Sequence, residues 1–133
     1  MKYFLDTNII IYAIKGTFDQ IKEHFKQVPM ESIVIPNIVM AEIEFGAYKS
    51  SNYKKTIEKY NEFTNHFDKI GFSEKAAKTY GKIRSFLEKN GNLMGPNDLI
   101  VASIVISEDG VLVTHNTKEF AKVKNLKIED WTK

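Results

Sequence analysis

The sequence predicts an α/β fold with a central, mostly parallel sheet that helices cover on both faces. Short runs of β-branched or aromatic residues alternate with longer segments whose apolar residues recur at helical spacing. This alternation is typical of parallel sheets, because two parallel strands need a long connection that is usually a helix. A chain of 133 residues with 43% hydrophobic residues can bury one good core, so we expect a single domain over residues 1–133.

The first half of the chain is expected to hold three strands and four helices. Its first strand ends at Asp6, and the triplet Asp6-Thr7-Asn8 has the residue types of a turn or a helix cap. Thr17 is a candidate cap for the second helix. The expected elements are strands at 3–5, 32–35 and 68–72, a helix that ends near residue 15, a helix after residue 17, and helices at 37–48 and 53–67.

The second half continues the alternation of helices and strands. Ser73 is a candidate cap for a helix with an apolar stripe, and the polar segment 90–92 ends that helix. Pro96 suits the first turn of the next helix, which runs to about residue 107. The remaining expected elements are a strand at 111–113, a short helix around 118–120 and an edge strand at 126–128.

Composition and charge exclude several classes of function. The chain has no cysteine, so it has neither disulfides nor a thiolate zinc site. No apolar run approaches the roughly 20 residues of a membrane span, and without a signal peptide the cytoplasm is the expected location. The net charge of +2 is too small to indicate nucleic-acid binding by itself. Arg84 is the only arginine, and lysines suit contact with phosphates better than reading of bases.

Three acidic residues lie where apolar elements reach the expected core. Asp6 follows the first strand, Glu42 shares a helix face with Ile38 and Phe45 that should face the core, and Asp98 heads an apolar helical stripe. Each acid alone has an ordinary explanation: a turn residue, a side chain that reaches water along its stem, or an acid favoured by the helix dipole. Together, unpaired carboxylates at the edge of a core would repel one another and lose hydration. A divalent cation such as Mg²⁺, which prefers oxygen ligands, resolves that conflict.

The segment after the expected strand 111–113 offers further candidates. Thr114 is placed to orient Asp6 or a ligand, and Asn116 either caps the short helix or supplies an amide oxygen. Glu119 is either a fourth acid at the rim of the site or an ordinary acid in the first turn of that helix. His115 is interpreted as a surface residue.

Four motifs in order resemble those of the PIN-domain ribonucleases, and more narrowly those of the VapC toxins of bacterial toxin–antitoxin pairs. The resemblance covers essentially the whole chain. The motifs are Leu5-Asp6-Thr7-Asn8, the segment 41–47 around Glu42, the segment 95–102 around Asp98, and the segment 112–120 with Asn116 and Glu119.

The resemblance implies a three-layer α/β/α sandwich and metal-dependent endonucleolytic cleavage of RNA, with Mg²⁺ or Mn²⁺ as cofactor. It implies that Asp6, Glu42 and Asp98 form the acidic core. The neighbours that would orient this core are Thr7, Asn8 and Asn97. Many PIN domains have a fourth acid where this chain has Asn116, which puts a second metal site in question unless Glu119 compensates.

The resemblance also implies partners. They are an RNA substrate, with initiator tRNA as the substrate class, a second copy of the chain in a homodimer, and an inhibitory VapB-type antitoxin through which the complex binds promoter DNA. An acidic pocket also suits a partner's arginine. Lysines near the site either steer the RNA backbone or form an ordinary charged surface; the candidates are Lys49, Lys54, Lys82 and Lys118.

Three other functions remain as alternatives. A haloacid-dehalogenase-type phosphatase also has an acid after its first strand, but it needs a second aspartate where this chain has Asn8. A receiver domain has its phosphoacceptor after a middle strand and offers no place for Glu42. A catalytically silent PIN fold that binds RNA or protein is the third alternative, and only an activity assay separates it from the nuclease.

Overall fold

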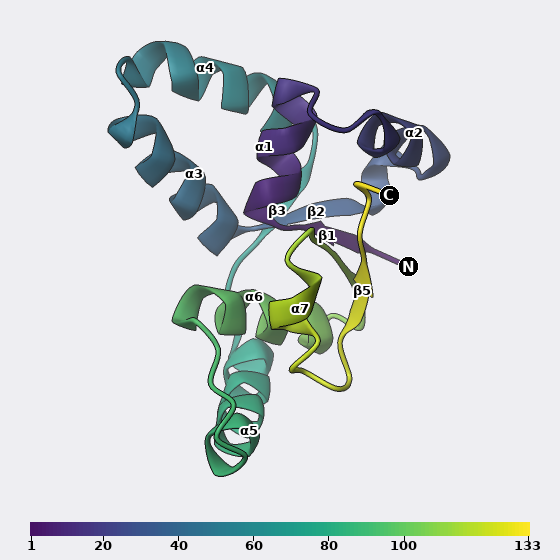
Figure 1. Ribbon diagram of the computed structural model, residues 1–133, viewed down its shortest axis with the longest axis vertical. Helices are drawn as coiled ribbons and strands as arrows, with labels where there is room; N and C mark the ends of the chain where they lie inside the picture. Colours follow the sequence, from purple (N-terminus) through teal and green to yellow (C-terminus); the bar gives the residue numbers. More distant parts are fainter.

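The computed structural model describes residues Met1–Lys133 and has one five-stranded sheet at its centre (Figure 1). All neighbouring strands are parallel, in the order β3-β2-β1-β4-β5, which confirms the predicted parallel sheet. The strands are β1 (Tyr3–Leu5), β2 (Ile33–Pro36), β3 (Asp68–Ile70), β4 (Val111–Val113) and β5 (Lys127–Glu129).

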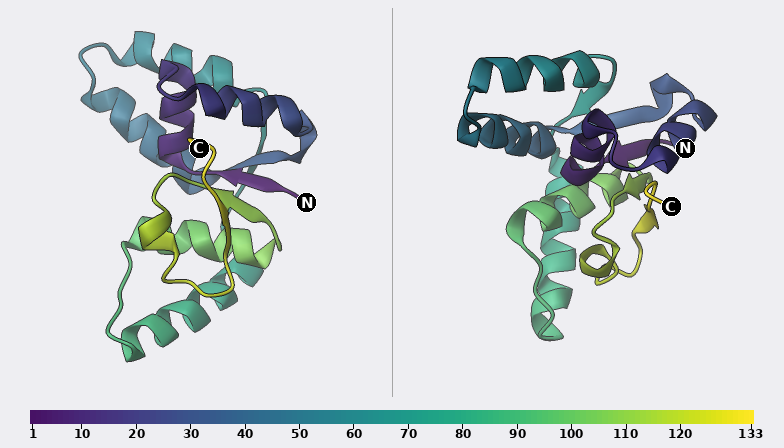
Figure 2. Two further views of the ribbon diagram at one scale, coloured as in Figure 1. Left: turned by 45° about the vertical axis from the view of Figure 1, so that its right-hand side comes forward. Right: turned by 45° about the horizontal axis from the view of Figure 1, so that its top comes forward.

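Helices lie on both sides of the sheet, so the predicted α/β/α sandwich is confirmed. Helices α1 to α4 lie on one side and α5 to α7 on the other, and the turned views show the same division (Figures 1 and 2). None of them is both long enough and apolar enough to cross a membrane. The helices are α1 (Thr7–Lys15), α2 (Asp19–Gln27), α3 (Asn37–Lys49), α4 (Tyr53–Thr64), α5 (Glu74–Lys89), α6 (Pro96–Ser107) and α7 (Thr117–Phe120), with a 3-10 turn, η1, at Met30–Ser32.

The sheet grows outward from β1 in two directions. β2 and β3 lie on one side of β1, whereas β4 and β5 lie on the other. The strand order therefore reverses between β1 and β4. Open α/β sheets bind ligands outside the carboxyl ends of their strands at such a reversal. The residues that follow Leu5 and Val113 are thus the first place to look for a site.

Helix α6 is the most buried helix, because it lies between the sheet and α5. Its segment Leu99–Val105 is almost entirely buried, which explains why its sequence has no clear polar face. The hydroxyl of Ser103 in this segment donates to the carbonyl of Leu99 at 2.7 Å, so the buried polar group is satisfied. The first turn of this rigid helix carries Asp98.

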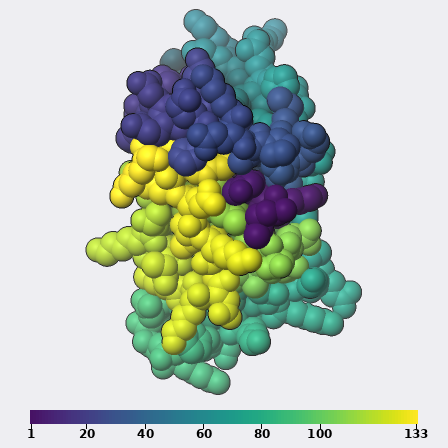
Figure 3. All heavy atoms as spheres, turned by 90° about the vertical axis from the view of Figure 1, so that its right-hand side faces the viewer, coloured from purple at the N-terminus to yellow at the C-terminus, as the bar shows by residue number.

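The C-terminal segment is held against the start of the chain by aromatic contacts. Trp131 is fully buried; its ring centroid lies 5.6 Å from that of Tyr3 and 5.1 Å from that of Phe25. The imidazole of His24 stacks on Trp131 with an interplanar angle of 3°. Figure 3 shows this segment, in yellow, lying across one face of the molecule beside the N-terminus and below α2.

Several predicted boundaries were wrong. Helix α4 ends at Thr64 rather than at Phe67, because a turn from Thr64 to Phe67 leads the chain into β3; Phe67 still packs edge-on against Phe63. Helix α2 begins at Asp19 and has no side-chain cap, so Thr17 does not have the predicted role. Strand β3 is shorter than expected, and β5 starts one residue later.

We predict that Gly110→Ala destabilises the fold. A Cβ at this position would lie 2.3 Å from Cε2 of the buried Phe4 ring and 3.0 Å from the carbonyl oxygen of Lys2. Such overpacking costs roughly 1–3 kcal/mol, measured as the loss of unfolding free energy in urea. Gly81→Ala is the matched control, since its Cβ meets nothing within 4 Å in a helix interior and should stabilise by about 0.5–1 kcal/mol. Equal stabilities for the two variants would contradict the prediction.

Candidate active site

Asp6 lies at the strand reversal and is held in place on all sides. Its backbone N–H donates to the carbonyl of Val113 at 2.9 Å, and the residue is only 5% exposed. One carboxylate oxygen accepts from the backbone N–H of Thr7 at 2.9 Å, and the other accepts from the hydroxyl of Thr114 at 2.7 Å. Burial raises the pKa of this carboxyl; both hydrogen bonds oppose the rise, and the negative charge of Glu42 adds to it.

Glu42 reaches the same place from α3. Its carboxylate accepts a hydrogen bond of 2.7 Å from the hydroxyl of Thr7. Thr7 therefore binds two acids, Asp6 through its backbone and Glu42 through its side chain. The helix positions that pack into the core are Val39, Ile43 and Ala47.

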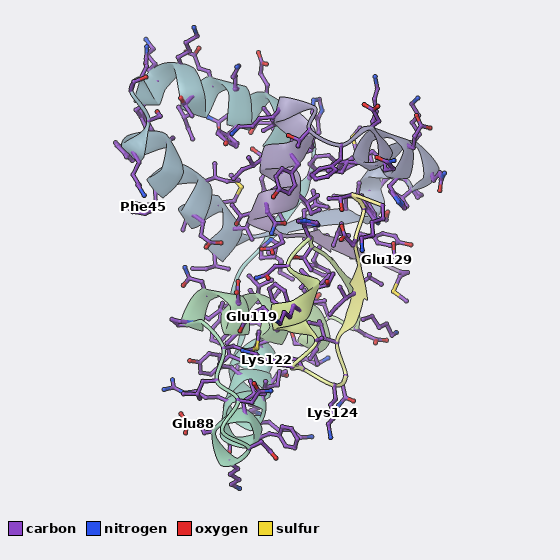
Figure 4. All side chains as sticks on the ribbon, in the orientation of Figure 1. Phe45, Glu88, Glu119, Lys122, Lys124 and Glu129 are labelled. Carbon is purple, nitrogen blue, oxygen red and sulfur yellow. The ribbon has the colours of Figure 1, made fainter.

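The prediction that Glu42 shares a core-facing side of its helix with Phe45 was wrong. Phe45 is 65% exposed and points away from the protein on α3 (Figure 4). Only one side of α3 packs on the core, and the side with Glu42 and Phe45 lines an open cavity. Glu42 lines this cavity and is therefore half-buried rather than fully buried.

Asp98 completes the group from the first turn of α6. Its carboxylate is half-buried and has neither a hydrogen bond nor an ion pair within the protein. Burial raises its pKa to about 6, with further contributions, in decreasing order, from the negative charges of Asp6, Glu42 and Glu119. Asp6, Glu42 and Glu119, which come from separate parts of the chain, are thus close enough to Asp98 to oppose its ionisation.

The loop between β4 and α7 closes the site on one side. The backbone N–H of Asn116 donates to the Thr114 hydroxyl at 3.0 Å, and the N–H of His115 donates to the side-chain oxygen of Asn8 at 3.3 Å. Asn116 precedes α7, yet its side chain makes no capping bond. The amide of Asn116 therefore remains exposed beside the residues that hold Asp6.

Glu119 differs from the other acids because it has a cationic partner. Its carboxylate lies 2.9 Å from the ammonium of Lys122, which also donates to the carbonyl of Leu93 at 2.9 Å. Sequence analysis missed Lys122, although its spacing of three residues from Glu119 on a helical turn was a usable signal. Asp6, Glu42 and Asp98 have no such partner.

Glu42 lines an open cavity of about 480 Å³, together with direct chain neighbours of Asp6 and Asp98. The cavity lies between α3 and the start of α6. The ammonium of Lys49, on the same helix as Glu42, lies 5.2 Å from the centre of the Phe45 ring. The lining residues are Thr7, Ala41, Glu42, Phe45 and Asn97.

The donor chemistry of this site suits a hard divalent cation. Asp6, Glu42 and Asp98 offer carboxylate oxygens, the ligands that Mg²⁺ and Mn²⁺ prefer. Their mutual repulsion is uncompensated by any lysine or arginine. As the side chains stand, however, no three acidic or histidine residues form a closed coordination shell.

Comparison with known proteins gives one family. Residues 3–126 match the PIN domain. The chain is 39% identical over 134 residues to ribonuclease VapC2 of Rickettsia felis, and 32% identical over 132 residues to the tRNA(fMet)-specific endonuclease VapC of Shigella flexneri, with 99% or more of each chain covered. The crystal structure of VapBC2 from Rickettsia felis bound to a promoter DNA fragment has a similar chain, with a TM-score of 0.90, 37% identity and coverage of 97% and 98%. The chain therefore belongs to the PIN-domain family and, within it, to the VapC-type ribonuclease toxins.

Proposed function

We propose that this chain is an endoribonuclease toxin that hydrolyses phosphodiester bonds of transfer RNA at the site of Asp6, Glu42 and Asp98, with Mg²⁺ or Mn²⁺. The observation that carries the proposal is the convergence of three carboxylates without counter-ions at the strand reversal. The relative from Shigella flexneri, named a tRNA(fMet)-specific endonuclease, supports initiator tRNA as the substrate class.

The chain's own residues would hold the cation with three carboxylates of different rigidity. When bound, the cation would supply positive charge against the scissile phosphate and promote ionisation of the attacking water. Asp6 is the fixed ligand, since both of its oxygens are hydrogen-bonded. Thr7 orients Glu42, whereas Asp98 has no partner and is free to adjust. Because Glu119 is paired with Lys122, three free carboxylates remain, which matches one divalent cation better than two.

The remaining residues of the site position RNA. The Asn97 amide lines the cavity together with Glu42, and Lys49 at the end of α3 would contact a backbone phosphate. Sequence alone made Lys82 another candidate for steering RNA at the acidic site. Lys82 instead lines a different cavity, on α5.

A VapB-type antitoxin and a second copy of the chain are the proposed protein partners. The similar chains from Rickettsia felis, Haemophilus influenzae and Salmonella typhimurium occur in VapBC structures. An arginine of the antitoxin would find unpaired carboxylates beside an open cavity, a good setting for a charge-assisted hydrogen bond. Promoter DNA would be bound through the antitoxin.

For the homodimer we propose a contact through the exposed aromatic residues of α3. Phe45 and Tyr48 are 65% and 69% exposed, and Tyr48 stacks on Tyr53 with centroids 4.0 Å apart. The hydroxyl of Tyr53 donates to the carboxylate of Glu44 at 2.9 Å, which fixes the ring beneath Tyr48. Rigid, exposed aromatic rings of this kind are enriched at protein interfaces.

The first prediction from this site concerns cleavage. Asp98→Asn should lower the rate of metal-dependent cleavage of total tRNA by at least about 100-fold, because it removes one charged ligand and its electrostatic contribution. The measurement is gel analysis of end-labelled tRNA with Mg²⁺ or Mn²⁺ and with excess chelator. Asp68→Asn, an exposed acid on β3, is the matched control and should cleave like the wild type.

The result also separates the nuclease from the silent binding module. Equal cleavage by wild type and a folded Asp98→Asn variant would mean that the carboxylates do not catalyse the reaction. No cleavage by wild-type protein that mass spectrometry shows to be free of antitoxin would favour the binding module. Circular dichroism of both variants excludes misfolding as the cause.

The second prediction concerns the pH dependence of stability without metal. The pKa of Asp98 is about 6 in the folded protein against 3.8 for the unperturbed group, so the folded state holds the proton more tightly. Protonated Asp98 therefore destabilises the fold less than ionised Asp98 does. This advantage is fully present below about pH 4 and is lost as the pH rises through about 6. Asp98→Asn should raise the melting temperature of metal-free protein at pH 7.5 and leave it nearly unchanged at pH 4.

Calorimetry of wild type, Asp98→Asn and the control Asp68→Asn tests this prediction. Mn²⁺ at pH 7.5 should stabilise the wild type more than the Asp98→Asn variant, since the cation relieves the same repulsion. A difference in melting temperature that is the same at both pH values would show that Asp98 ionisation does not destabilise the protein.

A further inference from the structure

A second cavity lies away from the carboxylates, between α5, the end of α6 and the loop that follows α7. Its volume is about 380 Å³, within the range of roughly 300–1,000 Å³ that is usual for ligand pockets. Its apolar lining includes Ile83, Leu87 and Val123, and three lysines surround this lining: Lys82, Lys122 and Lys124. No acidic residue lines the cavity, so its chemistry suits an anion that also has an apolar part.

Phe86 makes the cavity suited to an aromatic ligand. The residue is 45% exposed on the cavity side of α5, an unusual position for a large apolar ring. The ammonium of Lys124 lies 5.3 Å from the centre of this ring. A cation–π contact at an exposed site is weak, whereas a nucleic-acid base stacks on an aromatic ring more strongly. A base could therefore take the ring face and release Lys124 to a phosphate.

One ion pair connects this cavity to the acidic site. Lys122 lines the cavity, and its ammonium lies 2.9 Å from Glu119, whose negative charge contributes to the raised pKa of Asp98. Figure 4 shows Glu119, Lys122 and Lys124 in succession from α7 towards the loop before β5, with Glu88 on the opposite side of α5. A strand of RNA bound at the carboxylates would thus meet a positively charged cavity next to the site.

We propose that this cavity binds one nucleotide of the RNA substrate away from the scissile bond, with its base on Phe86 and a phosphate on Lys82 and Lys124. The inference deepens the proposed function and rests on it. Lysines bind phosphate as point charges without reading sequence, and stacking accepts any base. The cavity therefore adds affinity and orients the strand, while base identity is read elsewhere.

Binding of a fluorescein-labelled, 12-nucleotide single-stranded RNA tests the stacking contact. Fluorescence anisotropy is measured in the uncleaving Asp98→Asn background. Phe86→Ala should weaken binding by about 5- to 30-fold, whereas Phe86→Tyr, which keeps the ring, should bind like the parent. Phe72→Ala is the matched control, since Phe72 is 47% exposed and lies outside the cavity. In the otherwise wild-type enzyme, Phe86→Ala should raise KM for tRNA and leave kcat unchanged.

The salt dependence of binding tests the phosphate contact. Each lysine that neutralises a phosphate of single-stranded RNA contributes about 0.7 to the slope of log K against log salt. Lys82→Gln and Lys124→Gln should each reduce the slope by about that amount. Lys75→Gln, an exposed lysine at the start of α5, should not.

The outcomes distinguish this inference from the proposed function. If the Phe86→Ala and Phe72→Ala variants bind RNA as tightly as the parent while wild-type protein still cleaves tRNA, the cavity proposal is wrong and the nuclease stands. If neither wild type nor parent binds RNA, the proposed function itself fails. If AMP binds with a Phe86-dependent affinity but RNA does not compete with it, the cavity binds a free nucleotide and the RNA assignment is overturned.

Discussion

Uncompensated negative charge at one edge of the sheet is the constraint around which this fold is arranged. Asp6 is almost fully buried, and Asp98 and Glu42 add charge within reach of it. Burial and repulsion both disfavour ionisation of Asp6 and Asp98. Each ionised carboxylate therefore lowers the stability of the fold, and the surrounding structure must offset that loss. It does so by placing Asp6 at the start of α1 and Asp98 in the first turn of α6, where helix dipoles favour negative charge.

The topology explains why these acids come from distant parts of the sequence. The reversal of strand order between β1 and β4 leaves space outside their carboxyl ends, and Asp6 and Thr114 follow those two strands directly. The hydroxyl of Thr114 donates a hydrogen bond of 2.7 Å to the carboxylate of Asp6, although 108 positions separate the two residues. Phe4, Leu5 and the residues of β4 anchor this edge because they are fully buried or nearly so.

Much of this arrangement was predictable from sequence, because β-branched runs, cap residues and helical spacing are local signals. The strands near residues 3, 33 and 111 and the acids that follow or face them could be placed without coordinates. The orientation of α3 could not, since two apolar residues at helical spacing, Ile38 and Phe45, do not reveal that the side with Phe45 faces a cavity; Phe45 is 65% exposed rather than part of the core. The end of α4 at Thr64 depends on a turn, and the role of Lys122 depends on a loop that returns to Leu93.

Lys122 forms an ion pair with Glu119 and leaves Asp6, Glu42 and Asp98 without a cationic partner. By pairing with Glu119 and binding the carbonyl of Leu93, it fixes α7 to the loop that leads into α6, and α6 carries Asp98. The same ammonium separates a region of free carboxylates from a cavity lined only by basic, apolar and neutral polar groups. A polyanion such as RNA is repelled by the first region unless a cation is present, but it is attracted by the second. On our proposal, the positive cavity would give the chain affinity for a strand that its acidic site alone would repel.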